Sequence, residues 1–226
     1  MSFLQTVWLV LRKDFVIEIR SREILYTTVF FAVACVLVFS FGFVREGVPI
    51  EETAAGILWI AIAFSGTLAL GRTFERERQS ETLRALMIAP VDRPALYVAK
   101  LLGVLALLLA VEVLVVPLIA LLFRAPLFGE PVMLIAILIA GTVGFAAVGT
   151  LFAAMLVKAR SRDVLLPVLL YPITIPVIIA GVRGTAALLQ AETDVGMARA
   201  WLSLLVFFDA VFITLALWTF EPVMTE

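Results

Sequence analysis

Six long apolar stretches dominate the hydrophobic pattern of the chain. They cover residues 24–44, 54–71, 95–123, 132–157, 164–182 and 200–220. A helix that crosses about 30 Å of hydrocarbon needs roughly 20 mostly apolar residues. Backbone polar groups must be satisfied internally in lipid, so each stretch is expected to be helical. The pattern predicts an all-α, polytopic membrane protein with about six transmembrane helices in one domain, residues 1–226.

Residues 1–23 show a different periodicity ahead of the first stretch. Apolar residues recur every four positions, and charged residues fill the other faces, which predicts an amphipathic helix lying in the membrane interface. A plain cytoplasmic extension of the first span remains the alternative. The apolar positions are Phe3, Leu4, Val7, Trp8, Leu11, Phe15 and Ile19.

Basic residues are unevenly distributed among the connecting segments. The segments before the first span, between the second and third, and between the fourth and fifth are rich in arginine and lysine. The alternate segments hold only Arg45, Arg124, Arg183 and Arg199. The positive-inside rule therefore places the first set, and both termini, in the cytoplasm.

The composition agrees with a membrane protein and excludes several functions. The chain is 63% hydrophobic and 15% charged, whereas soluble domains have about 45–50% apolar and about 25% charged residues. It has no histidine and one cysteine, Cys35, which excludes an HExxH zinc site, a Ser–His pair and an internal disulfide. Its net charge of −1 gives no reason to expect nucleic acid. No catalytic residue, no metal site and no enzyme activity are predicted.

The longest polar segment, residues 72–94, reads RTFERERQSETLRALMIAPVDRP. Ser80 can cap a short helix that Pro90 and Pro94 end. Its apolar residues share one face, as expected of a cytoplasmic helix that docks into a groove on an ATPase. A solvated connection between two spans is the alternative. The predicted coupling residues are Glu75, Glu77, Glu81, Leu83, Arg84, Leu86 and Met87.

The chain has no GxxxxGK[ST] phosphate-binding loop. Such a loop cradles nucleotide phosphates with backbone N–H groups. If ATP drives this protein, the nucleotide site therefore belongs to a partner subunit.

Two blocks resemble a known family. GILWIAIAFSGTLALGRTFERERQSETLRALMIAPVDRPALYVAKLLG (56–103) and PVLLYPITIPVIIAGVRGTAALL (167–189) are similar to the haem exporter protein B family of cytochrome c maturation, CcmB-type permease subunits of ABC transporters. The resemblance implies an ABC-2-type permease fold in the bacterial cytoplasmic (inner) membrane. It also implies a cytoplasmic ABC ATPase, other cytochrome c maturation membrane subunits including one that handles haem, and a haem chaperone on the periplasmic side.

The loop sequence Glu81, Thr82, Leu83 and Arg84 is also similar to that of the broader ABC-2 permeases. Export of a drug, a lipid or a polysaccharide therefore remains the alternative function.

Haem ligation by this chain itself is not expected. Without histidine, an axial ligand would have to be a methionine, Tyr26, Tyr97, Tyr171 or Cys35, and none of these stands in a ligand motif. We therefore expect no directly bound cofactor. Another subunit is expected to hold the haem iron, and the ATPase to bind ATP.

Two carboxylic acids lie inside predicted spans, Glu112 in the third and Asp209 in the sixth. A charge at the bilayer centre costs about 2.5–3.5 kcal/mol on insertion scales, so such residues usually face protein or water. Contacts between helices or subunits are the favoured interpretation. A role in lining an export route, or a neutral carboxyl group with little role, stays open.

The fifth span contains Pro167, Pro172 and Pro176. Each proline removes a backbone donor and disturbs the preceding turn, so a kinked or broken helix is predicted. It could move or line a path, or only aid packing. The stretch 183–199 fits short re-entrant helices or an ordinary loop. In the fourth span Ala140, Gly144, Gly149 and Ala153 predict close helix packing.

Overall fold

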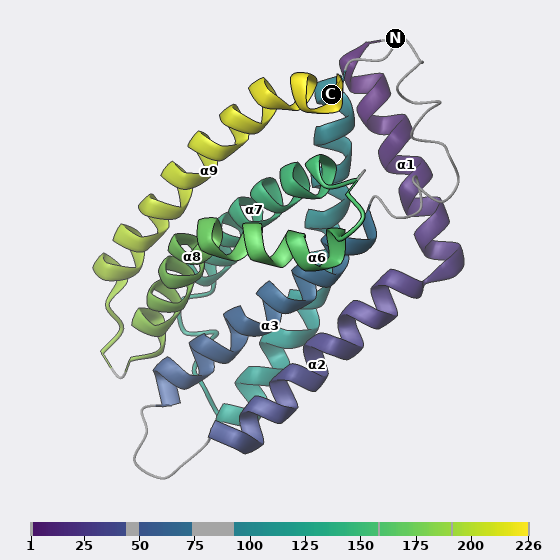
Figure 1. The fold of residues 1–226 in the computed structure, drawn as a ribbon. Coiled ribbons are helices and arrows are strands. Elements are labelled where there is room, and N and C mark those ends of the chain that lie inside the picture. Colours follow the sequence, from purple (N-terminus) through teal and green to yellow (C-terminus); the bar gives the residue numbers. More distant parts are fainter. Residues whose placement is uncertain (1, 44–49, 74–92, 158, 191, 226) are drawn as a thin grey trace.

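The computed structural model describes residues 2–43, 50–73, 93–157, 159–190 and 192–225. Within these ranges the chain forms seven helices and no strand, and six of the helices are long and apolar enough to cross a membrane. The predicted all-α, six-span fold is confirmed (Figure 1). The helices are α1 (Phe3–Ser21), α2 (Glu23–Phe43), α3 (Ile50–Thr73), α6 (Arg93–Phe123), α7 (Pro131–Met155), α8 (Arg162–Leu189) and α9 (Val195–Thr225).

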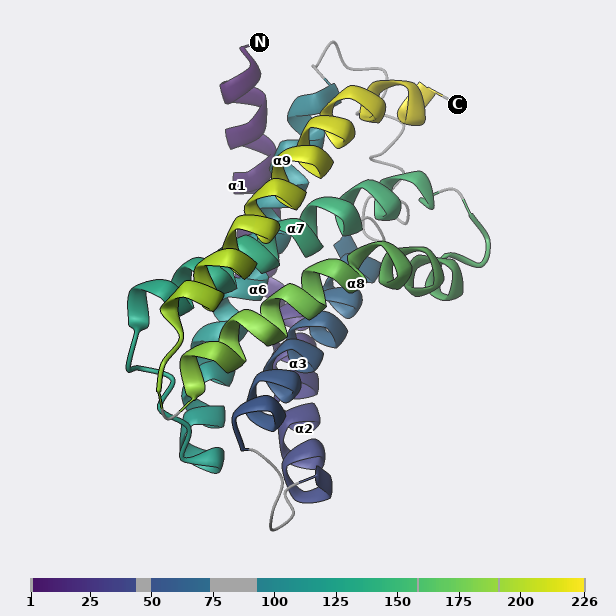
Figure 2. The same ribbon diagram turned by 90° about the vertical axis from the view of Figure 1, so that its left-hand side faces the viewer.

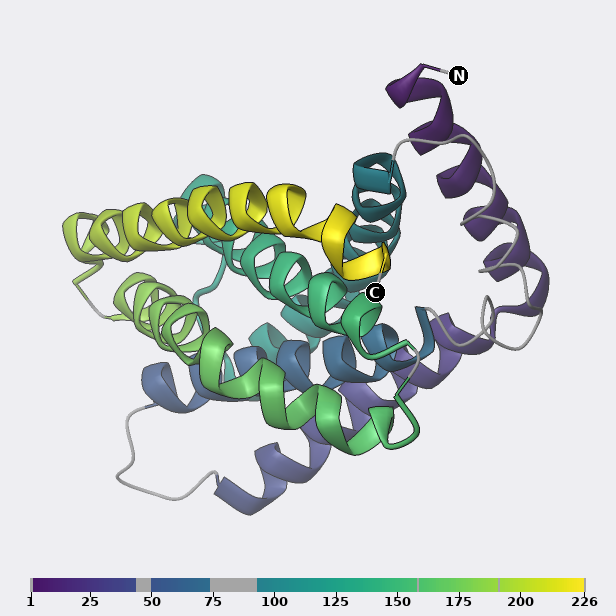
Figure 3. The ribbon, with the colours of Figure 1, turned by 45° about the horizontal axis from the view of Figure 1, so that its top comes forward.

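Helices α3 and α7 form the centre of the bundle. Helix α7 packs against α3, α6, α8 and α9, and α3 packs against α2, α6 and α8. Helices α2 and α9 are the least buried of the six spans and lie on the outside (Figures 2 and 3). The start of α1 and the end of α9 lie at the same end of the bundle (Figure 1), as an even number of spans requires.

Trp59 of α3 is the largest side chain in the core, with 1% of its surface exposed. Its ring lies against Gly141 of α7 and Gly181 of α8, where an added Cβ atom would overlap it. The indole Nε1 donates a hydrogen bond of 3.1 Å to Oγ1 of Thr185. A buried indole N–H normally has such a partner. One tryptophan therefore joins three helices, and the two glycines make room for it.

The small residues of α7 allow close packing along the rest of its length, as predicted. Leu70 of α3 lies on Gly149, and Asp209 and Phe208 of α9 lie on Gly144. A side chain at either glycine would displace these neighbours, because a Cβ atom there is too close to them. Small residues let helices approach in membranes, where hydrophobic exclusion does not drive association.

Helix α1 is held at both ends by local hydrogen bonds. Ser2 and Gln5 form a capping box, and the helix ends at Arg22, which has a φ of 53°. The Glu18 carboxylate accepts a hydrogen bond of 2.9 Å from the backbone N–H of Leu25 at the start of α2. Together these contacts fix the elbow between α1 and α2.

One side of α1 packs on α6 and buries Val7 and Val10. Leu4, Trp8 and Ile19 remain exposed. The predicted amphipathic helix is confirmed, and its position in the membrane interface stays a prediction.

Helix α8 is longer than the predicted span. It continues from 182 to Leu189, and α9 begins at Val195. Residues 183–189 therefore belong to α8 and residues 195–199 to α9, and they form neither separate re-entrant helices nor an ordinary loop. The extension is helical because its side chains are buried in the bundle: Thr185 binds Trp59, and Leu188 and Leu189 join the core. Helix α7 ends at Met155, two residues before the predicted end.

All three prolines of the fifth span lie inside α8. The helix is continuous through them, and its ribbon changes direction part-way along (Figure 2). Whether this segment moves during transport stays a prediction.

Candidate functional site

The predicted coupling residues, from Glu75 to Met87, lie outside the described residues. The structure does describe the two helices that this segment connects. Helix α3 ends at Thr73 and helix α6 begins at Arg93. How these two ends are held determines what a force applied to the segment can move.

The end of α3 is attached to two other helices. Arg72 Nη1 lies 2.7 Å from Glu23 Oε1 at the start of α2. Arg162 of α8, only 2% exposed, donates from Nη2 to the backbone oxygen of Leu70 at 3.0 Å. That carbonyl lies near the end of α3 at Thr73. The buried guanidinium therefore ties α3 to α8.

The start of α6 is also attached to other helices, through Lys100 and Tyr97. Lys100 has only 5% of its surface exposed, and its Nζ lies 2.8 Å from Asp14 Oδ2 of α1. One turn earlier, the Tyr97 hydroxyl donates a hydrogen bond of 3.0 Å to the backbone oxygen of Ala147 in α7. The centroid of the Tyr97 ring lies 5.4 Å from that of the Phe220 ring in α9. The first two turns of α6 are therefore fixed to three helices.

The contacts of Arg72, Tyr97, Lys100 and Arg162 define a candidate coupling site where α3 and α6 meet the 74–92 segment. Helices α3 and α6 also pack against each other. Both ends of the 74–92 segment thus continue into rigid, interlocked helices with paired charges. A partner that moved this segment would move α3 and α6, together with the helices attached to them, as a unit.

Glu112 of α6 is 4% exposed and receives a hydrogen bond from the hydroxyl of Thr142 in α7. Thr142 is fully buried. This contact agrees with the favoured interpretation of Glu112 as a group that binds a neighbouring helix. An intramembrane polar pair of this kind satisfies both partners where water cannot.

Asp209 of α9 lies on the other side of α7. Its Oδ1 is buried, has no hydrogen-bond partner among the described residues and sits over Gly144. Positions 142 and 144 differ by about 200° around a helix. The two acids therefore approach opposite faces of α7, and they do not form one carboxylate pair.

Exchange of Thr142 for valine tests the intramembrane pair. It should destabilise the bundle by roughly 1–3 kcal/mol because Glu112 keeps its buried carboxyl group and loses its donor. Glu112→Gln should be milder, since the amide oxygen still accepts from Thr142. The measurement is thermal loss of the monodisperse peak in size-exclusion chromatography, with Thr214→Val as control, because that hydroxyl donates within its own helix.

Glu112→Gln and Asp209→Asn test whether either acid has a role in transport. If Glu112→Gln and Asp209→Asn leave expression, assembly and activity normal, neither charge matters to transport. If Glu112→Gln assembles normally and abolishes activity, the contact interpretation is wrong and an ionisable group is required.

Comparison with known proteins identifies the family. The sequence model described as CcmB protein matches residues 5–224, a range that begins in α1 and ends in α9. This chain belongs to the CcmB family.

Three curated relatives are similar over most of their length, and each is named Heme exporter protein B. The protein of Paracoccus denitrificans is 33% identical over 155 residues, which is 67% of this chain and 69% of the relative. That of Rhodobacter capsulatus is 30% identical over 171 residues, 74% of this chain and 78% of the relative. That of Pseudomonas aeruginosa is 28% identical over 177 residues, 78% of each chain.

Several side chains of this CcmB chain that secure the candidate coupling site were not singled out from the sequence. In the sequence, Arg162 contributes only to the predicted membrane topology, and Asp14 is only one of the charged residues of a predicted amphipathic helix. Lys100 had the clearest signal: a lysine five residues inside an apolar stretch needs a partner. The partner itself, 86 residues away, has no sequence signature.

Proposed function

We propose that this chain is the membrane permease subunit of an ABC-type complex that couples ATP hydrolysis on a partner subunit to haem export, or to release of a haem-loaded chaperone, in cytochrome c maturation. The observation that carries the proposal is the CcmB family match over residues 5–224, with relatives named Heme exporter protein B. Those names favour haem over a drug, a lipid or a polysaccharide as the transported species.

The partners follow from this function. A cytoplasmic ABC ATPase binds residues 72–94 through the apolar face of Leu83, Leu86 and Met87, and glutamate and arginine side chains at the rim set its register. The subunit lies in the bacterial cytoplasmic membrane with both termini in the cytoplasm. Other membrane subunits of cytochrome c maturation complete the complex, and a chaperone receives haem on the periplasmic side.

Motion then passes through the candidate coupling site. ATP binding and hydrolysis shift the segment between α3 and α6, and the contacts of Arg72, Lys100 and Arg162 transmit that shift to α1, α2 and α8. The ATPase holds the nucleotide. A haem-handling subunit holds the iron, because this chain has no histidine to act as axial ligand.

Affinity purification of this protein from its own membranes tests the proposal, beside a variant with Leu83, Leu86 and Met87 changed to aspartate. We expect the ATPase and cytochrome c maturation proteins to co-elute with the unchanged chain. The aspartate variant should retain the membrane partners and lose the ATPase by more than about tenfold, because three charges cannot be buried in an apolar groove. Leu83→Met, Leu86→Met and Met87→Leu together form the matched control.

Two outcomes would contradict parts of the proposal. An ATPase that co-elutes with unrelated export proteins would leave the permease assignment standing and remove the haem assignment. Absence of any ATPase under gentle conditions would contradict the permease assignment itself.

A further inference from the structure

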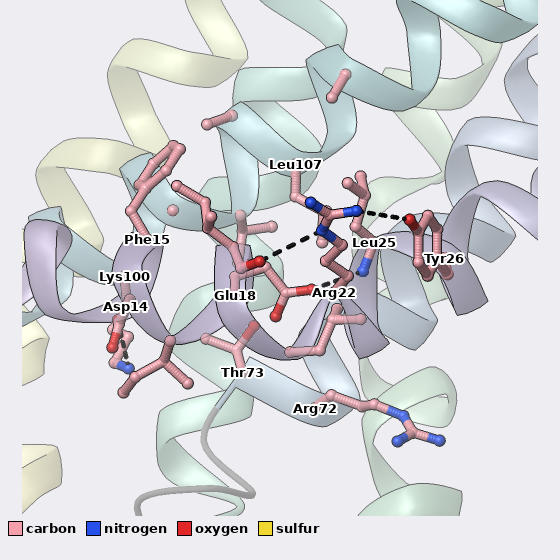
Figure 4. Close-up of a pocket in the computed structure, with 17 residues that line it drawn as sticks. Asp14, Phe15, Glu18, Arg22, Leu25, Tyr26, Arg72, Thr73, Lys100 and Leu107 are labelled. Carbon is pink, nitrogen blue, oxygen red and sulfur yellow. Dashed lines mark hydrogen bonds and ion pairs between the residues drawn. The ribbon is translucent and has the colours of Figure 1, made fainter.

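A groove of about 480 Å³ lies between the α1–α2 elbow and α6, with the end of α3 at its edge. Figure 4 shows the side chains that line it. Its volume is in the range of sites that hold small ligands, about 300–1,000 Å³. Arg72, Lys100 and Asp14 of the candidate coupling site lie along its lining, but the proposed coupling function does not require anything to occupy the space itself.

The groove changes from charged to apolar along α6. Lys100, Asp14, Glu18 and Arg22 lie across its charged part (Figure 4). Beyond Lys100, the α6 lining consists of five apolar residues: Gly103, Val104, Ala106, Leu107 and Ala110. The ten steps from Lys100 to Ala110 correspond to about 15 Å of helix. An amphiphile could place its polar group at one end and a hydrocarbon chain along the other.

Arg22 is the cation best placed to bind an anionic group here. Its Nε donates to the Ile19 oxygen at 3.4 Å, and its Nη1 donates to the Tyr26 hydroxyl at 3.2 Å. Both acceptors are uncharged. The carboxylates in the groove already have donors: Asp14 contacts Lys100, and Glu18 accepts from Leu25. A guanidinium so placed matches the oxygens of a phosphate group.

We propose that this groove binds one membrane phospholipid, with its phosphate on Arg22 and an acyl chain against Ala106, Leu107 and Ala110. Three observations favour a lipid over a water-soluble ligand. Six helices in the described part of the chain are long and apolar enough to span a membrane. The groove opens between a span and an amphipathic helix with exposed apolar residues. Its polarity follows the head-to-tail order of a phospholipid. The site is independent of the haem assignment.

Native mass spectrometry of the purified full-length chain in detergent, titrated with dioleoyl-phosphatidylglycerol, tests the proposal. We expect one tightly retained lipid. Ala106→Phe should fill the apolar part and lower retention about tenfold, whereas Ala210→Phe on the exposed face of α9 should not change it. Arg22→Asn should also lower retention about tenfold, since asparagine tolerates the positive φ and lacks the charge. Arg22→Lys should restore most of it, and Arg20→Asn is the matched control.

Dioleoyl-phosphatidylethanolamine should bind through the same phosphate and lose retention in the same two variants. The proposal is overturned if Ala106→Phe and Arg22→Asn retain lipid like their controls. It is also overturned if inorganic phosphate displaces the lipid at equal concentration, because the site would then be a simple anion site. Release of a co-purifying protein by Ala106→Phe, with lipid still bound, would assign the groove to that protein instead.

Discussion

Replacement of Trp59 by alanine is expected to destabilise the folded chain by about 3–5 kcal/mol, the usual cost of removing a large aromatic side chain from a packed core. The indole fills the space between α3, α7 and α8 and binds Thr185. Its removal leaves a cavity that Gly141 and Gly181 cannot fill, because neither has a side chain. Helices α3, α7 and α8 would lose the contact that they share.

Trp218 provides a matched control, since it is a tryptophan of α9 with 82% of its surface exposed. Trp218→Ala should leave the stability of the bundle nearly unchanged. Thermal loss of the monodisperse fraction in detergent, together with the level of the chain in membranes, measures both variants. Equal stability of Trp59→Ala and Trp218→Ala would show that α3 does not pack on the two glycines.

Trp59→Phe separates packing from hydrogen bonding. Phenylalanine fills most of the volume and loses the bond to Thr185. The expected loss is therefore smaller, about 1–3 kcal/mol, mainly from the unpaired Thr185 hydroxyl and the reduced volume.

The number and type of helices could be predicted from the sequence because lipid imposes a length and a composition on every span. The ends were harder to predict. Residues 183–189 begin with Arg183, Gly184 and Thr185, so hydropathy alone ends the predicted span at 182. Tertiary contacts extend the helix instead: Gly184 lies near Ile137 and Trp201, and Thr185 binds Trp59.

The candidate coupling site was predictable only in part. The polar segment 72–94 is visible in the sequence, as is the isolated acid Glu112, because charge stands out in apolar surroundings. The contacts that give the segment rigid ends join residues far apart along the chain. Arg162 binds Leu70 across 92 positions, and a single sequence holds no signal for such a pairing.

The contact between Asp14 and Lys100 leads to the second large expected effect. Asp14→Ala removes the Asp14 carboxylate from a lysine ammonium that is almost fully buried, and should cost roughly 1–3 kcal/mol. Lys100→Met should cost less, because the remaining carboxylate of Asp14 is a quarter exposed and water can solvate it. Thermal stability in detergent should therefore decrease more for Asp14→Ala than for Lys100→Met.

Lys13 gives the control for this pair. Its Nζ lies 3.2 Å from the other oxygen of Asp14, but its side chain is 38% exposed, and exposed ion pairs contribute about 0–1 kcal/mol. Lys13→Ala should therefore retain both stability and activity. If Lys13→Ala and Asp14→Ala were equally harmful, the burial of Lys100 would not be the cause.

Activity distinguishes an anchor for α6 from a contact that only stabilises the fold. At a temperature where Lys100→Met remains folded and membrane-inserted, α6 still packs on α1 but has lost its ion pair to Asp14, beside the segment that receives the ATPase. Under the proposed function, the ATPase should still co-purify with this variant, while the yield of c-type cytochromes should decrease several-fold. Normal yields would mean that movement reaches the bundle through α3, where Arg162 holds the last turn against α8, and that the attachment of α6 serves stability alone.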